Sequence, residues 1–318
     1  MILSTDLMPH APSNRQHRAS CGHGHAPGHA HALAPERFDR AMALGVGLNL
    51  AFVIVEAGCG LWADSLALLA DAGHNAGDVV GLLLAWGASR LARLAPSARY
   101  TWGLRRATIY AAFANATLLL AACGAIAWEA ITRLWSPEPV VGTIVVVVAA
   151  IGVAINTLTA LLFVRGHRDA NVRGAFLHMA ADAAVSAGVV AAGIAIALTG
   201  RVWIDPLVSL AVAAAIVAGT WGLFRESIDL ALDAVPRGIE TGRITQSLAG
   251  LPGVIDVHEL HVWGASTSET SLTVHLTVGP EVDRDAVLRA ADAMLRHDHL
   301  VAHAAIQVEG PAAECQRR

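Results

Sequence analysis

Apolar side chains dominate six long stretches within the first 224 residues, and short polar connections separate these stretches. A helix needs about 20 apolar residues to cross the hydrocarbon core of a bilayer. The pattern therefore predicts six transmembrane helices, with Ser65 as the N-cap of the second. The six stretches are Ala41–Trp62, Leu66–Leu91, Leu104–Ile131, Val140–Val164, Val172–Leu198 and Trp203–Phe224.

The pattern changes after Pro236. Leu272, Val274, Leu276 and Val278 alternate with polar residues, which is typical of a strand with one buried face. Together with its neighbours, this strand predicts the order helix, strand, strand, helix, strand. The predicted elements are Ile239–Leu251, Val254–Trp263, residues 271–278, Asp283–Asp298 and Ala304–Val308.

These patterns predict a mainly α membrane protein whose six transmembrane helices are followed by a small cytoplasmic α+β domain. The expected divisions are a histidine-rich disordered tail (1–38), a six-helix transmembrane domain (39–228), the α+β domain (236–310) and a C-terminal tail (311–318). Arginine is concentrated in the connections between spans two and three and between spans four and five. By the positive-inside rule, both termini are therefore cytoplasmic, and we expect a bacterial inner-membrane protein.

Composition agrees with this class of protein. Hydrophobic residues make up 55% of the chain and charged residues only 15%, against about a quarter in soluble proteins. The net charge of −4 gives no sign of nucleic-acid binding. Four scattered cysteines indicate neither a disulfide framework nor a zinc finger. Histidines in the first 36 residues leave two interpretations open, loose metal binding or a linker without a role.

Two of the predicted spans contain the same pair of polar side chains. His74 and Asp78 lie four residues apart, as do His178 and Asp182, so each pair shares one side of its helix. Two such helices facing each other would bring two imidazoles and two carboxylates together. That tetrahedral set of ligands suits Zn²⁺.

The membrane setting strengthens the metal hypothesis. A carboxylate at the centre of a bilayer costs at least about 2.5–3.5 kcal/mol, so such groups are normally partnered and functional. A single pair could instead be a structural hydrogen bond between helices. Two copies in two spans favour the metal site.

Several motifs taken together resemble the cation diffusion facilitator family of divalent-metal transporters, from about residue 40 to residue 310. They are Ser65-Leu-Ala-Leu-Leu-Ala-Asp71-Ala-Gly-His74-Asn-Ala-Gly-Asp78, Tyr100-Thr-Trp-Gly103, Asn171-Val-Arg-Gly-Ala-Phe-Leu-His178-Met-Ala-Ala-Asp182, Asp205-Pro206 and Val257-His-Glu-Leu-His-Val-Trp263.

The resemblance implies a homodimer with six spans per protomer and a cytoplasmic metallochaperone-like domain, which exports metal in exchange for protons. It identifies His74, Asp78, His178 and Asp182 as the transport site, in the form typical of zinc-preferring members. It also implies that His258, His275 and Glu309, with His303 near a further position, bind zinc in the cytoplasmic domain.

The spacing of His258 and His261, three residues apart on a strand, predicts that their side chains point to opposite faces, so the two would not share one ion. Of these two histidines, the resemblance implies that His258 is the zinc ligand. Each of these cytoplasmic histidines could equally be an ordinary surface residue.

The predicted mechanism is Zn²⁺/H⁺ antiport. Zinc requires neutral imidazole and ionised carboxylate, so loading the site releases protons and acid releases zinc. We find no glycine-rich loop that would bind a nucleotide. The alternatives are an intramembrane metalloenzyme, a membrane-anchored metal sensor, or export of Cd²⁺, Co²⁺ or Ni²⁺ by the same mechanism.

Overall fold

The computed structural model describes residues 35–163 and 170–311. The histidine-rich tail expected at 1–38 falls outside the described residues up to residue 34, and the C-terminal tail does so from residue 312.

Six long helices occupy the positions of the six apolar stretches. They are α1 (Pro35–Ala63), α2 (Leu66–Ala92), α3 (Ala107–Trp135), α4 (Gly142–Phe163), α5 (Ala170–Thr199) and α6 (Ile204–Ala231). Among the described residues, four of them, α3 to α6, are long and apolar enough to cross a membrane. Four polar side chains in the first half of α2, from Asp71 to Asp78, lower its hydropathy.

Each of these helices packs closely against only some of the others. The helix α2 packs against α3 and α6, whereas α5 packs mainly against α4. Small residues allow the α4–α5 contact, because a Cβ atom on Gly142 would come within 2.8 Å of the carbonyl oxygen of Gly193. Such close approach through small residues is typical of membrane helices. The buried core between the helices includes Leu68, Val145, Val189 and Ile216.

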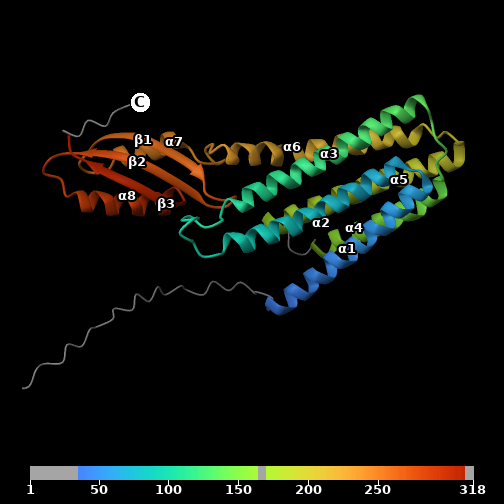
Figure 1. Cartoon of the computed structure of the whole chain (residues 1–318), viewed down its shortest axis with the longest axis horizontal. Helices are drawn as coiled ribbons and strands as arrows, with labels where there is room; N and C mark the ends of the chain where they lie inside the picture. Colours follow the sequence, from blue (N-terminus) through green and yellow to red (C-terminus); the bar gives the residue numbers. More distant parts are fainter. Residues whose placement is uncertain (1–34, 164–169, 312–318) are drawn as a thin grey trace, which may run out of the picture. The chain divides into compact units, whose positions relative to one another are not determined.

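The C-terminal part has the predicted order of elements. It consists of α7 (Thr241–Ala249), β1 (Val254–Gly264), β2 (Thr270–Val278), α8 (Arg284–Asp298) and β3 (Val301–Glu309) (Figure 1). The central strand β2 pairs antiparallel with β1 and parallel with β3. Both helices pack on the face of β2 that carries Leu272, Val274, Leu276 and Val278, as the alternation predicted.

An irregularity interrupts β1 where Glu259 adopts a positive φ of 50°. His258 pairs with His275 and His261 pairs with Thr273, so three steps along β1 match two along β2. This is the geometry of a β-bulge. Because residues paired across strands share a face, His258 and His261 lie on the same face. The prediction that they point to opposite faces was wrong, since it assumed an unbroken alternation.

Candidate metal centres

The first candidate centre lies between α2 and α5, where the two H-xxx-D pairs meet crosswise. The Nε2 atom of His74 lies 3.1 Å from Oδ1 of Asp182, and Nε2 of His178 lies 3.2 Å from Oδ2 of Asp78. Each histidine therefore contacts the carboxylate of the opposite helix. A second contact joins His178 to Oδ2 of Asp182 at 3.7 Å.

Three of these residues form a compact group. Single ligand atoms of His74, Asp78 and Asp182 all lie within 4.8 Å of one another. The side chain of Asp182 is only 3% exposed and that of His74 14%, whereas His178 is 48% exposed. The centre thus has a buried wall and a more open side, at His178. Two imidazoles and two carboxylates at these distances are the donor set that zinc prefers.

Buried polar groups extend from this centre. The hydroxyl of Ser186, one turn after Asp182 on α5, donates to Oδ2 of Asp71 on α2 at 2.7 Å. The amide of Asn75 donates to Glu56 on α1 at 3.2 Å. Asp71 lies about one turn before His74 on α2. Its hydrogen-bond donor, Ser186, lies on α5, which no spacing along α2 could have indicated.

The second candidate centre lies on the open face of the sheet, opposite α7 and α8. It brings together His258 on β1, His275 on β2 and Glu309 on β3. Oε1 of Glu309 lies 3.1 Å from Nδ1 of His275, and Oε2 of Glu309 lies 3.6 Å from Nε2 of His258. Glu309 is buried, and the imidazole of His258 is 15% exposed.

The polar atoms of this cluster fit a metal ion. Among the described residues, Nε2 of His258 and Oε2 of Glu309 are buried without a hydrogen-bond partner. Leaving such atoms unsatisfied is costly, and a cation would satisfy both. Asp256 lies at the edge of the cluster, with Oδ2 3.2 Å from Nδ1 of His258.

Two other histidines of the strands, His261 and His303, lie outside the cluster. His303 pairs with Ser271 near the start of β3, whereas Glu309 pairs with Thr277. Six residues of strand place His303 about 20 Å from Glu309. His261 is 66% exposed, and its Nε2 atom contacts Glu259 instead.

Comparison with known proteins places the chain in a family. The cation efflux transmembrane domain matches residues 42–230, and the cation efflux protein cytoplasmic domain matches residues 236–311. The chain therefore belongs to the cation efflux, or cation diffusion facilitator, family. It is an integral membrane transporter that exports divalent metal cations, and not an enzyme.

Individual relatives are similar over most of their length. The chain is 34% identical to the zinc transporter ZitB of Pectobacterium atrosepticum, with 88% of each chain covered. It is 32% identical to a cadmium, cobalt and zinc/H(+)-K(+) antiporter of Bacillus subtilis, with 82% of this chain and 86% of the other covered. Among solved structures, the metal-bound C-terminal domain of the CzcD transporter from Cupriavidus metallidurans matches 22% of this chain and 99% of its own, with 29% identity and a TM-score of 0.22.

Proposed function

We propose that this protein exports Zn²⁺ from the cytoplasm in exchange for protons, with His74, Asp78, His178 and Asp182 as the transport site. The observation that carries the proposal is the crosswise approach of two histidines and two aspartates from α2 and α5, at 3.1 and 3.2 Å. The names of the relatives agree, because they include zinc transporters and an antiporter that uses H⁺. Cd²⁺ and Co²⁺ remain candidate cargoes, since one relative carries them.

Proton coupling follows from the chemistry of these side chains. A zinc ion binds to neutral imidazole and to ionised carboxylate, so protons compete with it for all four residues. Acid on the release side protonates the ligands and displaces the ion. At neutral pH on the cytoplasmic side, the ligands are free to bind the next ion.

The proposed topology has six spans with both termini in the cytoplasm. The arginine-rich connections between α2 and α3 and between α4 and α5 then lie on the cytoplasmic side. The other connections, including the one that precedes α6, lie on the far side. The proposed location is the inner membrane of a bacterium, and the two relatives described above come from bacteria.

We also propose that His258, His275 and Glu309 bind zinc as a resident ion of the cytoplasmic domain. Three protein ligands leave one position of a tetrahedral shell for water or for a residue of another chain. The proposed assembly is a homodimer, as the family resemblance implies. His303 has no role in this site, because it lies six residues before Glu309, near the start of β3.

The test of the transport site is zinc uptake into inside-out membrane vesicles that contain wild type or Asp182→Asn. An amide in place of the carboxylate removes the charge and one of the two oxygen acceptors that face His74 and His178. We expect uptake to vanish while the amount of protein in the membrane stays unchanged. Asp292→Asn, on the exposed surface of α8, is the matched control and should transport at the wild-type rate. Wild-type uptake by Asp182→Asn would refute the site.

A further inference from the structure

A buried carboxylate of α6 holds the start of α2. Asp205, only 1% exposed, accepts hydrogen bonds from the hydroxyl of Ser65 at 2.5 Å and from the backbone N–H of Leu66 at 2.7 Å. The N–H of Ala67 donates to the same carboxylate at 3.4 Å. Ser65 in turn accepts from the N–H of Leu68 at 3.2 Å. The first three N–H groups of α2, which have no partner within the helix, are thus all satisfied here.

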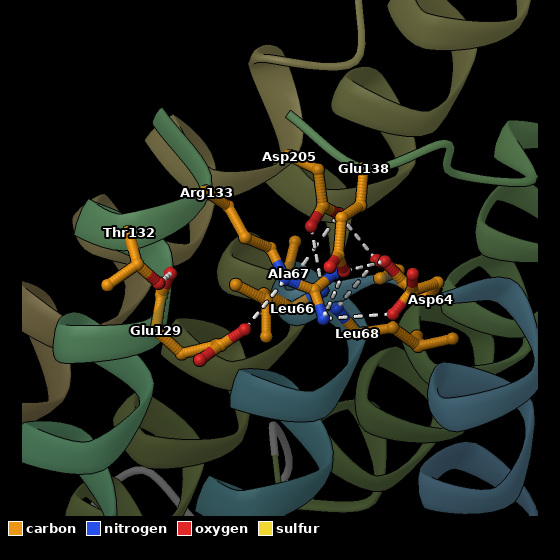
Figure 2. Close-up of polar contacts among 10 residues, drawn as sticks. Asp64, Leu66, Ala67, Leu68, Glu129, Thr132, Arg133, Glu138 and Asp205 are labelled. Carbon is orange, nitrogen blue, oxygen red and sulfur yellow. Dashed lines mark hydrogen bonds and ion pairs between the residues drawn. The ribbon is translucent and has the colours of Figure 1, made fainter. Parts of the chain in front are cut away.

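Arg133, at the end of α3, fixes the residue that precedes this cap. Its guanidinium donates to the backbone oxygen of Asp64 at 2.8 Å and to the carboxylate of Asp64 at 2.9 Å (Figure 2). Further ion pairs join Arg133 to Glu129 at 3.1 Å and to Glu138 at 3.1 Å. Asp64 has a φ of 54°, a left-handed conformation that these bonds help to hold.

The buried charge of Asp205 is offset by its hydrogen bonds and by the end of α2. A buried carboxylate is costly unless it is paired and hydrogen-bonded. The positive N-terminal end of α2 meets the carboxylate of Asp205 directly, and the guanidinium of Arg133 attracts it as well (Figure 2). Ser65, Arg133 and Asp205, which we call the clasp, therefore join α2 to both α3 and α6.

The clasp acts on the same helix that supplies His74 and Asp78. His74 follows Ser65 by nine residues, which is about 13 Å along the axis of α2. The partners of His74 and Asp78 lie on α5, which packs mainly against α4. The distance between the ligands on α2 and those on α5 therefore depends on the contacts of α2 with α3 and α6 and on the contacts of α5 with α4.

We propose that the clasp is a positioning device for the transport site, which holds α2 at the height where His74 meets Asp182 and Asp78 meets His178. This inference rests on the proposed function of these four residues. Ser65, Arg133 and Asp205 do not touch the metal. They act on its affinity through the position of α2.

The experiment compares Ser65→Ala and Asp205→Asn with wild type in the vesicle assay, as a function of zinc concentration. We expect the zinc concentration for half-maximal uptake to rise by about threefold in Ser65→Ala and about tenfold in Asp205→Asn, in line with the usual effect of losing a helix cap. Ser209→Ala is the matched control. Ser209 is also fully buried on α6, but its hydroxyl donates to the backbone oxygen of Asp205 and not to the clasp carboxylate.

A merely structural role would reduce the amount of folded protein and the maximal rate, and would leave the half-saturating zinc concentration unchanged. That result in both variants would overturn the positioning role. If Asp205→Asn does not accumulate in the membrane, Ser65→Ala decides alone, since it lacks only one hydroxyl.

The variant Asp78→Ala in the same assay separates this inference from the proposed function. Loss of uptake in Asp78→Ala, together with unchanged half-saturation in the clasp variants, would refute the clasp alone. Full uptake by Asp78→Ala would refute the transport site, and the positioning role with it.

Discussion

Asp182 has an unusual place among the four proposed transport ligands, because its two oxygens face two different histidines. Oδ1 lies 3.1 Å from His74 on α2, and Oδ2 lies 3.7 Å from His178 on its own helix. Asp78 contacts only His178 among these ligands. Asp182 is also the more buried carboxylate, at 3% exposure against 28%. The two aspartates are thus inequivalent, although the sequence places them in identical motifs.

Ser186 should matter for stability although it carries no charge. Its hydroxyl donates to the buried carboxylate of Asp71 and so links α5 to α2. Losing one hydrogen bond to a buried charged group costs about 1–3 kcal/mol. We expect Ser186→Ala to lower the melting temperature of the purified protein. Ser227→Ala is the control, because its hydroxyl donates to the backbone within α6. Equal melting temperatures for the two variants would contradict this role of Ser186.

Glu309 is the central residue of the proposed cytoplasmic zinc centre. Its two oxygens face His258 and His275, and one of them is buried without a hydrogen-bond partner. We expect Glu309→Gln to bind one zinc ion fewer per chain than wild type in equilibrium dialysis of the full-length protein. Glu259→Gln removes an exposed carboxylate on the same strand pair and should bind as wild type does. Equal zinc content in Glu309→Gln and wild type would exclude the cluster as a zinc site.

At the scale of elements, Arg296 ties the end of α8 to the start of β3. Its Nε atom donates to Asp292 one turn earlier at 2.8 Å, and Nη1 donates to the backbone oxygen of Ala302 at 3.3 Å. The order Asp292 then Arg296 along the helix is the favourable one. The hydrogen bond from Arg296 holds the pKa of Asp292 below its ordinary value.

The lowered pKa of Asp292 gives a prediction with a definite sign. A carboxylate whose pKa is lower in the folded state stabilises the fold above its unfolded pKa, and this contribution is lost as the pH falls through the folded pKa. We expect Arg296→Gln to raise the pKa of Asp292 towards the ordinary value, as measured by NMR titration of the labelled carboxyl. Arg284→Gln, in the first turn of α8 and eight residues from Asp292, should leave it unchanged. An unshifted pKa in Arg296→Gln would rule out the pair as the cause.

Local patterns in the sequence predicted the helices and strands, but they did not predict contacts between residues far apart in the chain. The six apolar stretches and the αββαβ order coincide with helices and strands in the described residues, and Ser65 does cap α2. Asp205 completes that cap from 140 positions away, which no periodicity encodes. The bulge at Glu259 also escaped prediction, since an alternation rule assumes an unbroken strand. The spacing predicted that the H-xxx-D pairs converge, but it could not give their crosswise pairing.

At the scale of the whole molecule, the proposed transport site joins two groups of helices. α2 is held by α3 and α6, through packing and through the clasp, whereas α5 is held by α4. The four proposed ligands are divided equally between α2 and α5. A relative shift of the two groups would therefore open the site without unfolding either group. This division suits a transporter that must expose one site to two sides of a membrane in turn.

Proton coupling is the property of the whole protein that the proposed site predicts. In inside-out vesicles, an acidic lumen should accelerate zinc uptake, because protons displace zinc from imidazole and carboxylate on the release side. We expect collapse of the pH gradient with nigericin to lower the initial rate of uptake by about tenfold or more, since one pH unit changes proton occupancy by up to that factor. The zinc retained by vesicles that contain His178→Ala measures binding to their outer surface, and this amount is subtracted. The variant keeps the other three proposed ligands. Zinc uptake of equal rate with and without the gradient would exclude antiport, and zinc binding with no uptake at all would favour a sensor.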